Sequence, residues 1–134
     1  MTTKNPTVSD YMTQSPHSIG FDQTLVQAHK LMREHDIRHL PVLRGGKLVG
    51  MLSERDLAFV EALRDVNSAK LRVEEAMTPL PFTAPPDAAL AGVAREMAEH
   101  RYGSAVVMRD GHVIGVFTTT DALRALADAL EGKA

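Results

Sequence analysis

The chain contains no cysteine and no tryptophan, and only two tyrosines and four phenylalanines among its 134 residues. Without cysteine the protein forms no disulfide, no thiolate zinc site and no thiol nucleophile, which is typical of a reducing compartment. Because aromatic rings are scarce, the core must be built from leucine, valine, alanine and methionine. Hydrophobic residues still make up 44% of the chain, as in ordinary globular domains.

Long apolar runs and a strong excess of one charge are also missing. No stretch approaches the roughly 20 residues of a membrane-spanning helix, and the segment after Met1 does not have the pattern of a secretory signal. The formal net charge is -2, with 15 basic and 17 acidic residues mixed along the chain, unlike the basic patch of a nucleic-acid-binding protein. We therefore expect a cytoplasmic protein whose partners include neither a membrane nor a nucleic acid.

The most informative feature that is present is an internal repeat. Residues 8–62 align with residues 73–127 without a gap, at an offset of 65 residues. Identical pairs are spread over the alignment and include Met12/Met77, Thr13/Thr78, Asp22/Asp87, Met32/Met97, His35/His100 and Arg44/Arg109. The clearest repeated segments are 46–56 and 111–121, where two glycines and two hydrophobic pairs precede a hydroxyl residue and an aspartate. One structural unit is therefore present twice.

Each repeat has the pattern strand, helix, strand, strand, helix. Apolar residues at helical spacing indicate the helices, and short apolar runs across a glycine-containing turn indicate a hairpin. In the first repeat we expect an edge strand at 18–19, a helix at 24–35 capped by Asp22 or Thr24, strands at 40–43 and 48–52, and a helix at 53–64. In the second repeat we expect a helix at 87–100, strands at 104–108 and 112–117, and a helix at 118–130.

The repeats are assigned to residues 8–64 and 73–130, with a short polar connector between them. A repeat of roughly 60 residues buries little surface by itself. We therefore predict an α/β (α+β) fold in which the two β-α-β-β-α repeats pack sheet to sheet about a pseudo-two-fold axis. Such packing creates a pair of like clefts.

The doubled unit with its glycine-to-aspartate signature resembles a tandem pair of CBS (cystathionine-β-synthase type) domains. The approach segments 12–22 and 77–87 and the turn at 35–42 resemble the corresponding parts of that family, so the resemblance covers about residues 8–127. It implies a stand-alone regulatory pair that binds an adenosine-containing ligand (AMP, ADP, ATP or S-adenosylmethionine) in clefts between the repeats and signals to an unidentified partner protein. It also implies a homodimer, because CBS-type pairs commonly form disc-like dimers through their helices.

The hydroxyl and aspartate of the signature have two interpretations. Ser53 with Asp56, and Thr118 with Asp121, have the spacing of a capping box, which satisfies the first free amides of a helix. The resemblance implies that the aspartates bind ribose hydroxyls and that Ser53 and Thr118 lie near a phosphate. A helix N-terminus suits a phosphate, and an ionised carboxylate accepts hydrogen bonds from a diol. Both roles stay open, since one residue can serve both.

Other residues are candidates for nucleotide contact. Arg55 is a candidate phosphate clamp, whereas its counterpart Thr120 carries no charge, so the two sites are expected to be unequal. The resemblance places further candidates near the base, namely Ser18, Thr83, Pro41 and Ser104, and His39 lies in the turn that resembles the family's. Arg38, near the mouth of a strand, is a further candidate for phosphate contact. For each of them, plain packing or solvation is the competing interpretation.

Nothing in the sequence has the pattern of a catalytic or metal-binding site. There is no Gly-x-Ser-x-Gly segment and no phosphate-binding P-loop, and the six histidines lack cysteines or a dense carboxylate cluster beside them. We expect no catalysis, no metal and no required cofactor, with an adenine nucleotide or S-adenosylmethionine as a regulatory ligand. Two alternatives are a structural dimerisation scaffold with vestigial clefts and a small nucleotide hydrolase.

Overall fold

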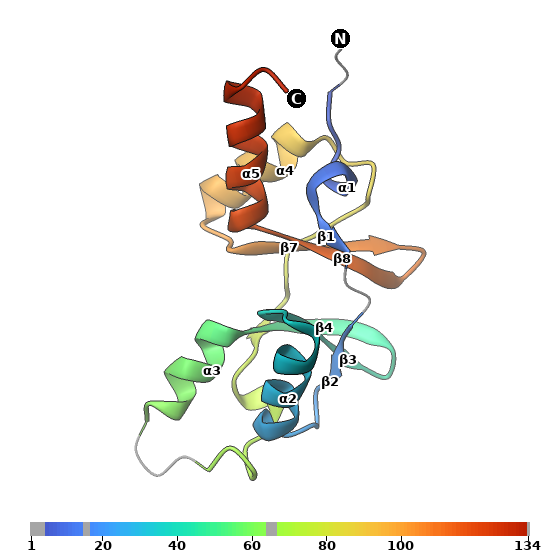
Figure 1. The fold of residues 1–134 in the computed structure, drawn as a ribbon. Helices are drawn as coiled ribbons and strands as arrows, with labels where there is room; N and C mark the ends of the chain where they lie inside the picture. The colour runs from blue at the N-terminus through green and yellow to red at the C-terminus, as the bar shows by residue number, and fades with distance from the viewer. Residues whose placement is uncertain (1–4, 15–16, 64–66, 134) are drawn as a thin grey trace. The chain divides into compact units, whose positions relative to one another are not determined.

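A computed structural model describes residues 5–14, 17–63 and 67–133. Within these ranges the chain forms two compact units. One unit is His17–Pro81, and the other combines the N-terminal segment with residues 82–133. Each unit contains helices and its own four-stranded sheet (Figure 1), so the predicted α+β class is confirmed.

The elements of the unit His17–Pro81 include those expected for the first repeat and, in addition, a 3-10 turn and a strand from the start of the second repeat. They are β2 (Ile19–Gly20), α2 (Leu25–His35), β3 (His39–Arg44), β4 (Lys47–Ser53), α3 (Glu54–Glu61), the 3-10 turn η1 (Val73–Glu75) and β5 (Thr78–Pro79). The strand order is β2-β3-β4-β5. Strand β2 is a parallel edge strand on β3, and β3 and β4 form the predicted antiparallel hairpin.

The other unit repeats this arrangement. Its elements are α1 (Val8–Tyr11), β1 (Thr13–Gln14), β6 (Thr83–Ala84), α4 (Leu90–His100), β7 (Ser104–Arg109), β8 (His112–Thr118) and α5 (Thr119–Leu130). The strand order is β1-β8-β7-β6. In the hairpins, the pairing of His39 with Ser53 recurs 65 residues later as the pairing of Ser104 with Thr118. Both hairpins also carry a register shift at the equivalent place, so the internal repeat holds residue by residue.

Each sheet is completed by a strand from the approach segment of the other repeat. Strand β1 pairs antiparallel with β8, and β5 pairs antiparallel with β4. The exchange extends into the cores, because Val8 packs with the core of α4 and Val73 packs with the core of α2. The compact units therefore differ from the repeats assigned as 8–64 and 73–130. No local sequence pattern reports such an exchange, since it depends on which distant strand a segment pairs with.

Each core is mainly aliphatic, as the composition predicts. In the unit His17–Pro81 the buried cluster comprises Ile19, Leu25, Ala28, Met32, Leu40, Val42, Leu52, Leu57 and Val73. In the other unit it comprises Val8, Ala84, Leu90, Val93, Met97, Ala105, Val107 and Phe117. Phe117 is the one aromatic member of these two clusters and is fully buried.

One of the two predicted caps of α2 is confirmed, whereas α4 starts later than predicted. Thr24 caps α2, and its hydroxyl accepts a hydrogen bond from the Gln27 amide, so the alternative cap Asp22 is wrong. Helix α4 begins at Leu90 rather than at residue 87. The residues before it form a turn, and the Leu90 amide donates to the Pro6 carbonyl at 3.0 Å. Pro6, in the N-terminal segment, thus supplies the acceptor that a capping side chain supplies elsewhere.

Helix α3 is shorter than predicted and ends at Glu61 instead of at residue 64. The Leu63 amide donates to the Val60 carbonyl at 3.1 Å, which is the three-residue spacing of a tightened last turn. The predicted end, Arg64, lies outside the described residues.

Candidate functional site

The first candidate group lies where β4 passes into α3. Ser53 is the last residue of β4 and the N-cap of α3. Its hydroxyl accepts a hydrogen bond from the Asp56 amide at 3.0 Å, and Oδ2 of Asp56 accepts one from the Ser53 amide at 2.8 Å. The capping-box interpretation is therefore confirmed here. Because the box uses one carboxylate oxygen, the other remains open to a further donor.

Asp56 is half-buried, and among the described residues its Oδ1 has no hydrogen-bond or ion-pair partner. Arg55, at the second position of α3, is exposed. We call Ser53, Arg55 and Asp56 the Asp56 half-site. It combines a free carboxylate oxygen with the positive end of a helix dipole and a nearby guanidinium.

Of the four other candidates in this unit, His39 and Arg38 lie beside the half-site. His39 pairs with Ser53 across the hairpin. Arg38 forms an exposed ion pair with Glu54, with its Nε 3.8 Å from Oε1, and such a pair contributes little to stability. Pro41 is fully buried, on the face of β3 opposite its core-facing neighbours. Ser18 precedes β2 and is half-buried, without a hydrogen bond to the signature residues.

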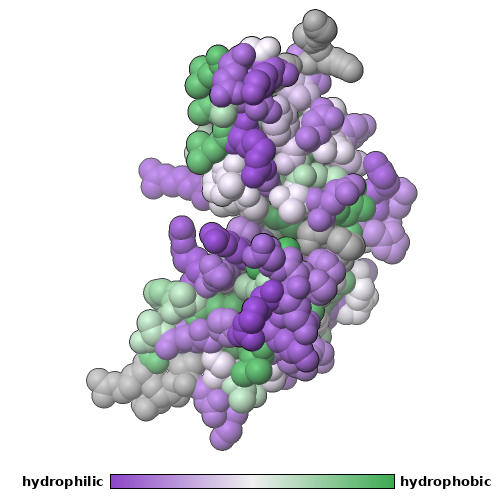
Figure 2. Space-filling model, viewed as in Figure 1, coloured by the Kyte–Doolittle hydropathy of each residue, from purple (hydrophilic) through white to green (hydrophobic). Residues whose placement is uncertain are grey.

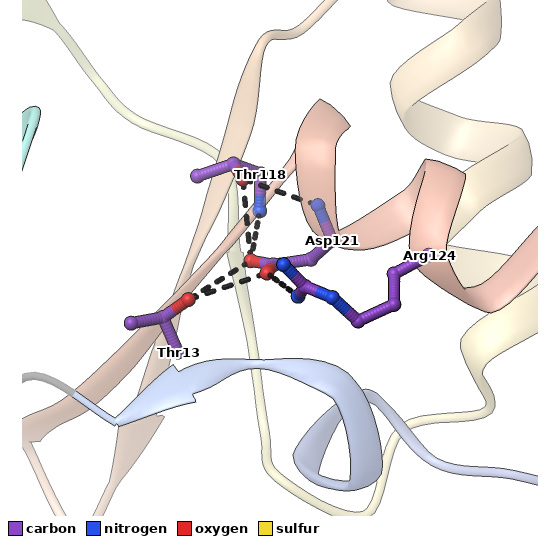
Figure 3. Close-up of polar contacts among 4 residues, drawn as sticks. All are labelled: Thr13, Thr118, Asp121 and Arg124. Carbon is purple, nitrogen blue, oxygen red and sulfur yellow. Dashed lines mark hydrogen bonds and ion pairs between the residues drawn. The ribbon is translucent and has the colours of Figure 1, made fainter.

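The second candidate group lies at the equivalent place, where β8 passes into α5 (Figure 3). Thr118 caps α5, and its amide donates to Oδ2 of Asp121 at 2.9 Å. The Asp121 amide in turn donates to the Thr118 hydroxyl at 3.4 Å. We call Thr118, Thr120 and Asp121 the Asp121 half-site. Its backbone frame matches that of the Asp56 half-site, as the repeat predicts.

The surroundings of the Asp121 carboxylate are different. Asp121 is only 2% exposed, and Nη1 of Arg124 lies 2.9 Å from its Oδ1 (Figure 3). The hydroxyl of Thr13, on β1, lies 3.2 Å from Oδ1 and 3.4 Å from Oδ2, and the Thr118 hydroxyl lies 3.2 Å from Oδ2. A buried carboxylate is costly unless it is paired and hydrogen-bonded, and these contacts supply both. Both oxygens of Asp121 are therefore already occupied.

The remaining candidates of this unit lie on its strands and on α5. Ser104 pairs with Thr118 across the second hairpin. Thr120 is exposed and uncharged at the second position of α5. Thr83 begins the edge strand β6 and is exposed. The structure thus brings Ser104 next to the signature and leaves Thr83 at the edge of the sheet.

Thr13 and Arg124 are contacts of Asp121 that the sequence reasoning missed. Arg124 was detectable, because an arginine three residues after an aspartate lies on the same helical face. Thr13 was not, because it lies 108 residues from Asp121 in the sequence and reaches it through the strand exchange.

The described part of the chain holds no group of three or more His, Cys, Asp or Glu side chains placed to bind a metal ion. Among the helices of the described ranges, none combines the length and apolar character that crossing a bilayer requires.

Comparison with known proteins extends these observations. The model of the CBS domain family matches residues 8–62 and 73–128. Inosine-5′-monophosphate dehydrogenase of Korarchaeum cryptofilum is 34% identical over 115 residues, which cover 85% of this chain and 22% of the enzyme. The CBS domain-containing protein YhcV of Bacillus subtilis is 26% identical over 114 residues, which cover 85% of this chain and 81% of YhcV. The chain therefore matches only a minor part of the dehydrogenase but most of YhcV.

Two solved structures are similar over nearly the whole chain. The CBS domain pair of protein MJ0100, in complex with 5′-methylthioadenosine and S-adenosyl-L-methionine, has a TM-score of 0.82 and 28% identity, covering 94% of this chain and 99% of that chain. CBSX2 in complex with AMP has a TM-score of 0.75 and 26% identity, covering 91% of this chain and 97% of that chain. Both of these similar proteins carry adenosine-containing ligands.

Proposed function

The chain belongs to the CBS domain family, and from this premise we propose that it is a cytoplasmic regulatory module that binds an adenosine-containing nucleotide. The observation that carries the proposal is the Asp56 half-site, where a half-buried carboxylate keeps one oxygen unpaired among the described residues at the start of a helix. The similar pairs MJ0100 and CBSX2, which hold S-adenosyl-L-methionine, 5′-methylthioadenosine or AMP, support this choice of ligand class.

In this proposal the ribose diol donates to the carboxylate of Asp56. Hydrogen bonds to an ionised group are among the stronger ones, at about 1.5–3 kcal/mol each. The phosphate lies near Ser53 and the first amides of α3, where the helix dipole favours negative charge. Arg55 adds a cation beside it, so this side prefers the more phosphorylated ligand.

Other side chains take supporting roles in the proposal. The residues assigned to base or phosphate contact are Ser18, Arg38, His39 and Pro41 in one unit and Thr83 and Ser104 in the other. Thr118, Thr120 and Asp121 are the equivalent candidates for phosphate and ribose at a second, separate half-site. The proposal includes no chemical step, so the ligand leaves unchanged. Its occupancy shifts a conformational equilibrium that an unidentified partner protein detects.

Calorimetric titration with AMP, ATP and S-adenosylmethionine tests the proposal. The wild-type protein should bind at least one of them, and ligand at a hundred times its dissociation constant should add about 2.7 kcal/mol to the free energy of unfolding. Asp56→Ala should weaken binding by at least about tenfold, which corresponds to about 1.4 kcal/mol. Chromatography of the recovered ligand tests for turnover. Wild-type affinity in Asp56→Ala would show that Asp56 is only a helix cap.

A second candidate function is a dimerisation scaffold. Exposed apolar residues on α5 favour this function. Leu123, Leu126 and Leu130 are 65%, 53% and 79% exposed, and their spacing places them along one side of the helix. Figure 2 shows hydrophobic side chains gathered on the outer side of α5. Because monomers rarely leave such a stripe uncovered, we propose that a second copy of the chain covers it in a homodimer.

Light scattering at micromolar concentration tests the dimer. The wild-type protein should have twice the mass of one chain, and Leu126→Glu should have the mass of one chain because a charge would be buried in the interface. Leu80→Glu is the matched control, since Leu80 is 90% exposed and lies outside the helices. A monomeric wild type would contradict the dimer. A dimer that binds none of the three nucleotides would favour the scaffold.

A further inference from the structure

The two signature aspartates differ in how many donors their carboxylates already hold. Asp121 accepts hydrogen bonds from Thr118, Thr13 and Arg124, and its side chain is 3% exposed. Asp56 accepts one from Ser53, is half-buried, and has an open Oδ1 among the described residues. A ribose diol brings two donors and needs acceptor sites that are not already engaged. Only the Asp56 carboxylate meets this requirement.

One substitution between the repeats accounts for the strongest part of this difference. The position 65 residues before Arg124 is Phe59, which lies three residues after Asp56, as Arg124 lies three residues after Asp121. Phe59 is 69% exposed and offers no donor. The guanidinium of Arg124 forms a charge-assisted hydrogen bond at 2.9 Å, and this kind of contact is roughly twice as strong as a neutral one.

We propose that Arg124 closes the Asp121 half-site to nucleotide, so that each chain binds one nucleotide, at the Asp56 half-site. The inference rests on the proposed nucleotide-binding function and specifies where it acts. A ribose at Asp121 would have to displace the guanidinium and then leave the buried carboxylate without its counter-charge. A ribose at Asp56 displaces no side chain. Arg124 therefore acts as a specificity-determining residue, through Asp121 rather than through the ligand.

Exchange of the two residues provides a reciprocal test. Calorimetric titrations with AMP and with S-adenosylmethionine are compared for the wild type, Phe59→Arg, Arg124→Phe and the double exchange. We expect one nucleotide per wild-type chain. In Phe59→Arg, binding should weaken by at least about tenfold, because the new arginine can pair with Asp56 as Arg124 pairs with Asp121. In Arg124→Phe a second nucleotide should bind, and in the double exchange the single site should move to Asp121.

Additional substitutions identify the site that is occupied. Asp56→Ala should weaken the single binding event of the wild type by at least about tenfold, and Asp121→Ala should weaken that of the double exchange to the same extent. Phe59→Arg keeps the test decisive if Arg124→Phe fails to fold, because residue 59 is exposed and the substitution leaves no buried charge unpaired.

The outcomes separate the inference from the proposed function. Two nucleotides per wild-type chain, or an unchanged affinity in Phe59→Arg, would overturn the inference while leaving nucleotide binding intact. If Arg124→Phe binds a single nucleotide, and binds it more weakly than the wild type does, the inference is also overturned, because Arg124 would then be a ligand contact. No binding of either nucleotide to any of the four proteins would overturn the proposed function and the inference together.

Discussion

Strand β1 lies against β8 at Gly115, a residue without a side chain. A Cβ at this residue would lie 2.8 Å from the Thr13 carbonyl oxygen and 2.8 Å from the sulfur of Met12. Both distances are too short for real contacts, and the carbonyl belongs to the backbone of β1. Any side chain here would push β1 away from β8. The repeated glycine thus serves the strand exchange.

We predict that Gly115→Ala lowers the free energy of unfolding by about 1–3 kcal/mol, because overpacking forces a backbone shift. Gly92→Ala is the matched control. Gly92 lies within α4, and a Cβ there would have no atom within 4 Å, so the substitution should stabilise by about 0.4–1 kcal/mol. Urea unfolding monitored by circular dichroism measures both. Equal stability of Gly115→Ala and the wild type would show that β1 does not need this close approach.

At the scale of the elements, the side chain of Glu61 connects three segments of its unit. It is the last residue of α3, and its Oε2 lies 2.7 Å from Nε2 of His29 on α2. The same oxygen accepts a hydrogen bond from the hydroxyl of Ser68, in the connector after α3, at 2.6 Å. The Ser68 hydrogen bond lowers the pKa of Glu61, as does the contact with His29, while partial burial opposes this shift.

A pKa that is lower in the folded than in the unfolded protein makes stability depend on pH. The contribution of Glu61 should be fully present above its unfolded pKa, near 4.3, and should be lost as pH falls through the lower folded value. Urea unfolding between pH 3 and pH 6 should therefore show a smaller acid-induced loss for Ser68→Ala than for the wild type. Ser9→Ala, in the other unit and with no hydrogen bond to Glu61, His29 or Ser68 in the described part of the chain, should keep the wild-type pH profile. Identical profiles for Ser68→Ala and the wild type would contradict the prediction.

At the scale of the whole molecule, the exchanged approach segments make each unit depend on a distant part of the chain. Val8 and Val73 are both fully buried, each in the core of the unit that its approach segment completes. Substituting either by alanine should cost about 2 kcal/mol, from lost burial and from the cavity left behind. The two variants should nevertheless affect different regions.

Hydrogen exchange can locate these effects. Val8→Ala should speed amide exchange chiefly in α4 and α5, and Val73→Ala should speed it chiefly in α2 and α3. Each variant is the control for the other. Faster exchange of Val8→Ala within residues 17–63 would contradict the assignment of the N-terminal segment to the other unit.

The sequence by itself determined the features that depend on residues close together in the chain. Helical spacing, glycine-containing turns and the Ser/Thr-to-Asp capping boxes act within a few residues, so the hairpins and the starts of α2, α3 and α5 were predictable. The internal repeat was equally readable, and it identified Asp56 and Asp121 as equivalent positions. Local patterns could not place the start of α4, because its first amide donates to Pro6 in a distant segment.

Only the tertiary structure decided how deeply each of the two equivalent aspartates is buried and which remote donor one of them meets. The exchange of approach segments brings Thr13 to Asp121, whose buried carboxylate also pairs with Arg124, a side chain that is itself 59% exposed. The Thr13 contact arises from strand pairing between remote segments, which no short-range pattern encodes, whereas the three-residue spacing of Asp121 and Arg124 was readable in the sequence. Identical signatures therefore lead to one carboxylate with a free oxygen and another that is fully engaged, because electrostatic environment is a property of the folded neighbourhood.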